Sequence, residues 1–353
     1  MLYPAALLGV AAISAGVTAY LRPRVEVVTV AVRPSATSPP QPAALFRVAL
    51  RAPAPVGRDP VRHRTAQHPR STPSLYERTT SPVVLREQGC RAGSARTSGI
   101  VILDFGKPAY ADGAYGTITF SNRFASNTAI TQALKSYARG YGACLPKRAR
   151  ARITLVRGTS NYRLWTLPSG VTAGRYWAGE TVAFAAYLKH HGLDGHVTAA
   201  AGDDAEPAWD RTFQRTYNFF RGFRSAGSGY LLYNYGSLDG GPGTIWTVQQ
   251  AYYVAAGMRY ARAVPEIYNR RMAQQWALLS RLAAERYGRG VSFAGVMTQH
   301  SQHCASGCYT PAQAHRALVR ELSKSPKTRV QARTLASATN IATPAPVRAN
   351  RAR

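Results

Sequence analysis

The sequence predicts an α/β fold in which one domain is built around a mostly parallel sheet. Between residues 90 and 308, six short β-like runs alternate with amphipathic helical segments. Such β–α repeats imply parallel strands, because a helix carries the chain back to the starting edge of the sheet after each strand. The sheet is then either a closed barrel or a doubly wound open sheet. An eight-stranded barrel requires two strands beyond the six clear runs.

The predicted strands are short and apolar, and several end at a polar residue. Residues 100–103 form a continuous apolar run that ends at Asp104, as expected for a strand buried on both faces. The remaining five runs are residues 152–156, 197–201, 230–233, 261–267 and 291–296.

The segments between these runs carry apolar residues at helical spacing. Helices are predicted over residues 128–139 and 174–191, closed by Gly140 and Gly192, because glycine readily takes the left-handed conformation that ends a helix. The other predicted helices are one that carries Trp209, Phe213, Tyr217 and Phe220, one that carries Trp246, Tyr253 and Val254, and one from Tyr268 to Gly288.

The chain divides into four parts by composition. Residues 1–21 are largely apolar and uncharged, and they are predicted to be a signal peptide or a membrane anchor. Residues 22–87 and 323–353 are rich in Pro, Arg, Ser, Thr and Ala and lack apolar periodicity, so they are predicted to be disordered N- and C-terminal tails. The folded domain is therefore expected to span residues 88–322. The protein is expected to be secreted or held in the cell envelope.

The chain is strongly basic. It has 45 Lys and Arg residues against 16 Asp and Glu residues, a formal net charge of +29. This charge attracts polyanions, among them anionic cell-wall polymers. The basic residues are spread along the chain and form no block interleaved with aromatic residues, so a nucleic-acid partner is not expected. The protein is expected to be a monomer.

Four cysteines, Cys90, Cys144, Cys304 and Cys308, flank the predicted sheet. In an exported protein an even number of cysteines indicates disulfides, and the sequence allows three pairings. We favour the two local pairs, Cys90–Cys144 and Cys304–Cys308. The alternative is a zinc site, because two histidines lie at ligand spacing just before Cys304. Disulfides account for all four cysteines, so no metal is predicted.

Acidic residues are scarce, which makes their positions informative. Six lie at strand ends or in a loop that follows a strand: Asp104, Asp203, Asp204, Glu206, Asp239 and Glu266. In parallel α/β barrels the active site lies at the carboxyl ends of the strands. Carboxylates there either take part in catalysis or cap helix N-termini. We favour catalysis for Asp204 and Glu206, and we add Asp104 and Glu266 to the predicted catalytic set, although a structural role is as well supported for these two.

Paired carboxylates hydrolyse glycosidic bonds, because one protonates the leaving oxygen while the other attacks the sugar or activates water. Asp204 and Glu206 lie two positions apart on an extended backbone, so their side chains point to the same side. Repulsion between them raises the pKa of one, which suits a general acid. The residues predicted to bind substrate are Tyr233, Tyr235, Asp239, Trp246 and Gln299. All five tryptophans are candidate sugar platforms, although Trp177, Trp209 and Trp276 are better explained as helix core residues.

Five motifs follow one another between residues 99 and 299. They are Asp104-Phe105-Gly106-x-Pro108, Gly202-Asp203-Asp204-Ala205-Glu206-Pro207-x-Trp209, Tyr233-Asn234-Tyr235-Gly236-Ser237, Pro265-Glu266-Ile267-Tyr268 and Gln275-Trp276. In this order they resemble secreted glycoside-hydrolase-like barrel proteins of actinobacteria. The Asp-x-Glu element is also similar to that of muramidases and chitinase-type barrels, in which the Glu is the acid and the Asp steers an N-acetyl group. The resemblance implies a TIM-type (β/α) barrel with Glu206 as acid and Asp204 as its helper, although the spaced aspartates that lead into this element in chitinase-type barrels are absent.

The leading prediction is an exported glycosidase that acts on a cell-envelope or extracellular polysaccharide, with peptidoglycan among the candidates. The alternatives are a catalytically inert barrel that binds cell-wall glycan and a basic envelope protein that binds anionic polymer through its tails. No cofactor is expected, because the sequence has no nucleophile elbow, Walker-type, zinc-protease or dinucleotide-binding motif.

Overall fold

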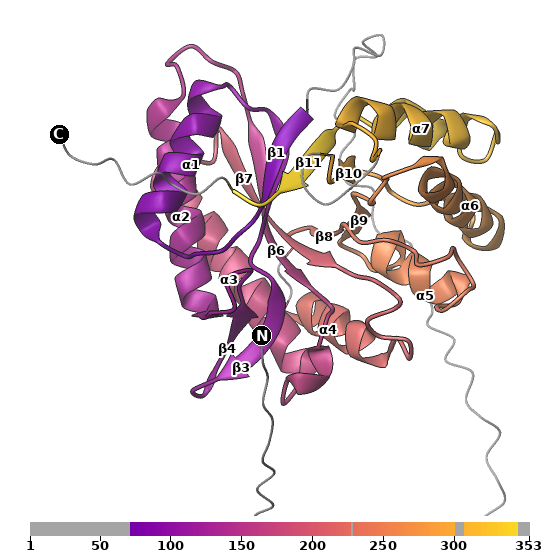
Figure 1. The fold of residues 1–353 in the computed structure, drawn as a ribbon, viewed down its shortest axis with the longest axis horizontal. Coiled ribbons are helices and arrows are strands. Elements are labelled where there is room, and N and C mark those ends of the chain that lie inside the picture. Colours follow the sequence, from indigo (N-terminus) through magenta and orange to yellow (C-terminus); the bar gives the residue numbers. More distant parts are fainter. Residues whose placement is uncertain (1–70, 227–228, 301–306, 345–353) are drawn as a thin grey trace, which may run out of the picture. The chain divides into compact units, whose positions relative to one another are not determined.

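The computed structural model describes residues 71–226, 229–300 and 307–344 (Figure 1). Eight strands form the main sheet: β1 (Ser71–Tyr76), β2 (Gly99–Asp104), β6 (Ile153–Ser160), β7 (Val197–Asp204), β8 (Leu232–Asn234), β9 (Ala261–Ala263), β10 (Val296–Thr298) and β11 (Ala338–Ala342). Their order is β10-β11-β1-β2-β6-β7-β8-β9, and every pair is parallel. Parallel bridges from Ala263 to Phe293 and from Glu266 to Met297 join the two edges. The sheet is therefore a nearly closed barrel, which confirms the predicted fold class.

Helices connect the strands and surround the barrel (Figure 1). They are α1 (Pro82–Ser94), α2 (Asn127–Cys144), α3 (Gly170–His190), α4 (Gln214–Ser225), α5 (Val248–Tyr252), α6 (Arg270–Tyr287), α7 (Pro311–Ser323) and α8 (Arg329–Thr334). The side chains of Ser126, Ser169 and Asn269 each accept a backbone N–H from the first turn of α2, α3 and α6, which fixes where these helices begin. Gly288 ends α6 in the left-handed conformation, with φ 73°, as predicted.

A small antiparallel sheet is inserted between β2 and α2. Its strands are β3 (Lys107–Ala111), β4 (Ala114–Ile118) and β5 (Phe124–Ser126). Asp112 and Gly113 both have positive φ and form the two-residue turn between β3 and β4, as in a tight hairpin. This sheet is not among the predicted elements, because its strands are short, rich in Ala and Gly, and without a clear apolar alternation.

Alternate residues of the strands fill the inside of the barrel, while the positions between them face the helices. In β2, Ile100 and Ile102 belong to the inner cluster, and Val101 and Leu103 pack in the layer under the helices. The inner cluster is Tyr76, Ile100, Ile102, Val156, Ala200, Tyr233, Tyr235, Val264, Met297 and Ile341. Side chains alternate between the two faces of each strand. At the carboxyl ends of the strands, the inward-facing side chains next to this cluster therefore lie at the mouth of the barrel.

The domain is wider than predicted at both ends. β1 lies within the predicted tail 22–87, and β11 lies within the predicted tail 323–353. These two strands pair with each other and supply the strands that the barrel needed beyond the six clear runs. Both tail predictions are therefore wrong over these segments.

The reason is that β1 turns polar side chains inward. Ser74 and Thr339 are buried, and their hydroxyls lie 2.6 Å apart across the β1–β11 pair. The Ser74 hydroxyl also accepts the backbone N–H of Ile102, at 2.8 Å. Because these hydroxyls find partners inside the barrel, Ser and Thr can occupy positions where an apolar pattern would have marked a strand.

α1 and α2 pack closely through glycine. A Cβ on Gly89 would lie 2.0 Å from the carbonyl oxygen of Tyr137, and a Cβ on Gly140 would lie 2.0 Å from that of Arg86. Gly140 is thus inside α2, where it lets two backbones approach, and it does not end the helix as predicted. The predicted disulfide Cys90–Cys144 joins these two helices.

Several predictions fall on residues outside the described ranges. Cys304 is one of them, so its pairing with Cys308 stays a prediction, although Cys308 is itself disulfide-bonded. The predicted signal peptide or anchor, 1–21, is another. Among the helices of the described ranges, none is both long and apolar enough to cross a membrane.

Candidate active site

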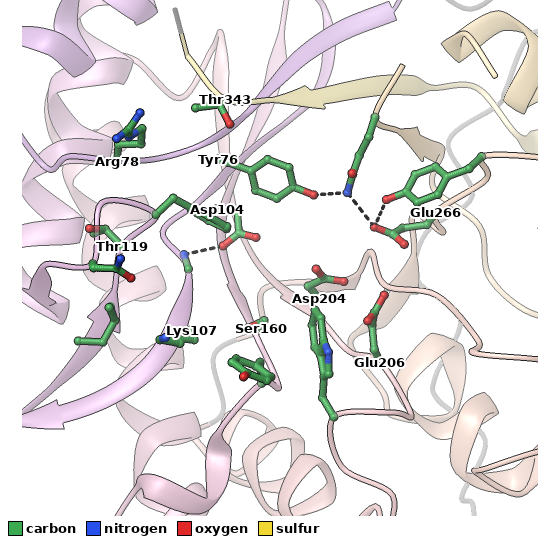
Figure 2. A pocket seen from close by; sticks show the side chains of 18 residues that line it. Tyr76, Arg78, Asp104, Lys107, Thr119, Ser160, Asp204, Glu206, Glu266 and Thr343 are labelled. Atoms are coloured by element: carbon green, nitrogen blue, oxygen red, sulfur yellow. Dashed lines mark hydrogen bonds between the residues drawn. The ribbon is translucent and has the colours of Figure 1, made fainter. Parts of the chain in front are cut away.

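A cleft of about 1040 Å³ opens at the carboxyl ends of the barrel strands (Figure 2). Tyr76, Asp104, Ser160 and Asp204 are the last residues of β1, β2, β6 and β7, and all four line it. The loops that follow the strands supply further lining residues, among them Glu206, Glu266 and Gln299. The cleft is therefore where an active site is expected in a parallel barrel.

Four carboxyl groups meet in this cleft. Asp104, Asp204 and Glu266 are buried, with 1%, 6% and 4% of each residue exposed, while Glu206 is half-buried. Asp204, Glu206 and Glu266 each bring one oxygen within 4.8 Å of the others. The four residues predicted to be catalytic thus line one cleft, and three of them are in near contact.

The strand β7 and the loop after it position the side chains of Asp204 and Glu206 in the cleft. Gly202 faces the inside of the barrel, where a Cβ would lie 2.8 Å from the Tyr235 ring, and Asp204 follows on the same side two residues later. Asn161 then holds the loop, because its side chain accepts the N–H of Glu206 at 3.0 Å and donates to the carbonyl of Glu206 at 2.9 Å. Asn161 is fully buried and is not among the predicted site residues.

Glu266 is held by two donors. The hydroxyl of Tyr268 and the side-chain amide of Gln299, at 3.4 Å, both donate to its Oε1. The Gln299 amide also donates to the hydroxyl of Tyr76, which lies across the cleft (Figure 2). Gln299 is therefore in the cleft as predicted. Tyr76 and Tyr268 were not among the predicted site residues, because Tyr76 lies in a segment predicted to be disordered and Tyr268 was assigned to the start of a helix.

Burial dominates the electrostatics of these carboxyl groups. It raises the pKa of Asp104 to about 7, although a hydrogen bond from the backbone of Gly106 works in the opposite direction. Burial, with the nearby charge of Asp239, raises the pKa of Glu206 to about 7. Burial and their acidic neighbours raise the pKa values of Asp204 and Glu266 well above the ordinary range. Near neutral pH the cluster therefore holds protons.

Four of the residues predicted to bind substrate do not line the cleft. Tyr233 and Tyr235 are buried in the inner cluster of the barrel, where the Tyr235 hydroxyl donates to the carbonyl of Thr159 at 2.7 Å. Trp246 is buried, and its indole N–H donates to the carbonyl of Asp210 at 2.6 Å. These aromatic residues pack the interior, and the burial of Trp246 corrects its assignment as a sugar platform.

Asp239, the fourth residue predicted to bind substrate that does not line the cleft, stabilises the loop after β8 through hydrogen bonds. Its two carboxyl oxygens accept the backbone N–H of Ala208 and the hydroxyl of Ser237, each at 2.7 Å. Asp239 therefore influences the site through its charge beside Glu206 and through the position of the loop.

Other aromatic side chains lie at the cleft in place of Tyr233, Tyr235 and Trp246. Trp209 precedes α4 and lies in a loop, so it lines the cleft and does not pack in a helix core as expected. The ring of Tyr162 lies 5.5 Å from that of Trp209 and 5.9 Å from that of Trp165. Phe120, from the inserted sheet, lines the cleft as well. These four rings form what we call the aromatic rim: Phe120, Tyr162, Trp165 and Trp209.

No protein-family model matches this chain, and no curated protein matches it. The fold and the cleft are therefore the basis for a functional proposal. Chemically, the cleft offers buried acids that keep a proton near pH 7, together with exposed aromatic faces. The oxygens of Asp204, Glu206 and Glu266 are also of the kind that Mg²⁺ and Ca²⁺ bind.

Proposed function

We propose that the protein is an exported glycoside hydrolase that acts on a cell-envelope or extracellular polysaccharide. The observation that carries this proposal is the meeting of Glu206 and Glu266 in an open cleft with aromatic walls. A pair of carboxyl groups in a protein-lined cleft is the arrangement that cleaves glycosidic bonds. The cleft volume of about 1040 Å³ lies at the upper end of small-ligand sites, so more than one sugar ring fits.

The environments of the two glutamates assign their roles. Glu206 is half-buried and its pKa is raised to about 7, so near neutrality it keeps a proton that can reach a bound sugar. Glu266 accepts hydrogen bonds from Tyr268 and Gln299, which lower its pKa, while burial and the charge of Glu206 raise it more. In the reactive state that we propose, the pair shares one proton, with Glu206 as the general acid and Glu266 as the ionised partner. Asp204 lies beside them, and its buried Oδ1 has no hydrogen-bond partner in the described part of the chain.

The short spacing of the carboxyl groups favours a retaining reaction. Retaining enzymes place the two groups about 5–5.5 Å apart, while inverting enzymes need about 6.5–9.5 Å to admit a water. One oxygen of Glu206 and one of Glu266 lie within 4.8 Å of each other, and on this close approach we propose the shorter, retaining arrangement. In the first step Glu206 protonates the glycosidic oxygen and Glu266 bonds to the anomeric carbon, so that the glycosidic bond breaks and the leaving sugar departs as an alcohol. In the second step Glu206, now a carboxylate, takes a proton from the water that displaces Glu266.

Two further features support export. The disulfide Cys90–Cys144 suits an oxidising compartment, where such bonds persist. The apolar residues 1–21 have the composition of an export signal or anchor. We therefore propose that the substrate lies outside the cytoplasm.

The decisive experiment is release of reducing sugar from a panel of purified wall and extracellular polysaccharides. Glu206→Gln keeps the side-chain shape and removes the proton donor, so activity on the accepted substrate is expected to fall by about 10²–10⁴-fold. Glu87→Gln, on the exposed side of α1, is the matched control and is expected to keep full activity. Equal activity in wild type and Glu206→Gln would rule out Glu206 as the acid.

The pH profile and the effect of a chelator distinguish the proposed metal-free hydrolase from a metal-dependent protein and from an inert barrel. Activity is expected to decline as pH rises through about 7, because Glu206 then loses its proton. Treatment with EDTA is expected to leave activity unchanged. A loss that Ca²⁺ or Mg²⁺ restores would show instead that the three carboxyl groups hold a metal ion. Binding of a polysaccharide without any release of reducing sugar would favour the inert barrel.

A further inference from the structure

We propose that the cleft selects a polysaccharide that carries anionic substituents, held by Arg78 and Lys107 opposite the carboxyl groups. This inference rests on the proposed function and names the class of substrate. Recognition of anionic polymer then takes place in the cleft itself and not in the tails.

The cleft has two sides of opposite character (Figure 2). Asp204, Glu206 and Glu266 lie on one side, Arg78 and Lys107 lie on the other, and Asp104 lies between them. Arg78 follows β1, and Lys107 begins the inserted strand β3. The basic side is thus supplied by segments different from those that carry the acids.

These two cations are not used to neutralise the acids. Within the described ranges, neither Arg78 nor Lys107 forms an ion pair, although acidic groups line the same cleft. Protons reduce the negative charge of the acids near neutral pH, because burial raises their pKa values. Lys107 is half-buried and its ammonium lies 5.8 Å from the centre of the Tyr162 ring. A partly desolvated cation next to an aromatic face gains most from an anion that the ligand brings.

The aromatic rim lies beside these cations. Tyr162 and Trp165 are 40% and 45% exposed, and Tyr162 links Trp165 to Trp209 in the cleft. Exposed aromatic faces stack on the apolar faces of sugar rings. A sugar stacked on Tyr162 would therefore carry its substituents next to Lys107. A carboxylate or a phosphate on that sugar supplies the missing partner, whereas a neutral sugar leaves the cation without one.

The test is binding by the full chain with Glu206→Gln, so that turnover does not interfere. The probes are peptidoglycan glycan strands freed of peptide, which carry carboxylates, and the same strands after their carboxyl groups have been reduced to alcohols. A teichoic acid is the third probe, because it carries phosphate groups in place of carboxylates. Tighter binding of the carboxylated strands would identify carboxylate as the anion, and tighter binding of the teichoic acid would identify phosphate.

Removing both cations by Arg78→Gln with Lys107→Gln is expected to weaken binding of the preferred anionic polymer by about tenfold or more, the scale of one or two charge-assisted hydrogen bonds. Binding of the reduced strands is expected to change little. The control is Lys189→Gln with Arg286→Gln, an equal change of charge on exposed residues in the last turns of α3 and α6, at the other end of the barrel.

Three results decide the proposal. The proposal is supported if the double variant Arg78→Gln with Lys107→Gln binds the anionic polymer more weakly and the control double variant does not. An equal loss in the control double variant would mean that only the net charge of +29 attracts the polymer, and this would overturn the proposal. Unchanged binding by the double variant Arg78→Gln with Lys107→Gln would overturn it as well. Tyr162→Ala is expected to weaken binding of charged and reduced strands alike, because stacking does not depend on the anion. Failure of hydrolysis leaves these binding comparisons intact, so the two proposals can fail separately.

Discussion

At the scale of single residues, this barrel buries acidic groups and keeps them neutral. Asp203 is 1% exposed, and neither of its carboxyl oxygens has a hydrogen-bond partner among the described residues. Glu77, at the end of β1, is fully buried, and burial raises its pKa to about 8. Such groups cost little while protonated and much when ionised, because a buried charge loses its hydration.

Glu77 therefore ties stability to pH. Its pKa is raised on folding from 4.5 to about 8, so the folded state binds the extra proton between these values. The free energy of unfolding is expected to fall as pH rises from about 4.5 to about 8. Each tenfold change in proton affinity is worth about 1.4 kcal/mol, so the contribution of Glu77 is at most roughly 5 kcal/mol. Gln88 and Arg91 on α1 and Asp104 on β2 are the groups that modulate it.

Glu77→Gln is expected to flatten this dependence, because it keeps the hydrogen-bonding shape and cannot ionise. Urea unfolding at pH 5 and pH 8 measures it, with wild type and the surface variant Glu87→Gln as references. The variant should gain stability over wild type at pH 8 and differ little at pH 5. A variant whose stability follows pH as steeply as wild type would show that Glu77 is not the group responsible.

At the scale of elements, α1 and α2 are joined both by close packing and by a covalent bond. The disulfide Cys90–Cys144 closes a loop of 54 residues, which encloses β2 and the inserted sheet. In the chain-entropy description, a loop of this length contributes about 4 kcal/mol.

Cys90→Ala with Cys144→Ala is expected to lower the melting temperature clearly, while the barrel still folds because the helices keep their contact. Calorimetry of wild type and variant gives the difference, and reduction of the wild type should reproduce it. Peptide mapping without reductant is expected to show Cys90–Cys144 and Cys304–Cys308, with no bound metal. A melting temperature independent of reductant, or stoichiometric zinc removed by EDTA, would contradict this account.

At the scale of the whole molecule, barrel closure depends on the two strands nearest the ends of the described chain. β1 pairs with both β2 and β11, and β11 pairs with β10. Tyr76 and Thr343, which belong to these end segments, also line the cleft. The domain and its candidate site are therefore completed together.

Truncation tests this dependence. A protein trimmed to residues 71–344 is expected to be soluble and to unfold cooperatively. A protein trimmed to residues 88–322 is expected to aggregate or remain unfolded, because it loses β1 and β11 and exposes the strand edges of β2 and β10. Circular dichroism and thermal unfolding distinguish the two. Cooperative unfolding of the shorter protein would mean that the six inner strands suffice.

The class of fold, the approximate places of six of the eight strands and the carboxyl groups of the cleft could be predicted from the sequence alone. This was possible because the apolar runs and the acids that follow them are local patterns, and strand ends in a parallel barrel share one mouth. Which polar segments are strands could not be predicted in this way, because the hydroxyls of β1 and β11 find their partners across the sheet, and this is known only from the folded structure. The folded structure also shows that Trp246 is buried while Trp209 lines the cleft, and that Asn161 holds Glu206. The exposure of a side chain and its hydrogen-bond partners depend on contacts between distant parts of the chain, and a local sequence pattern does not predict such contacts.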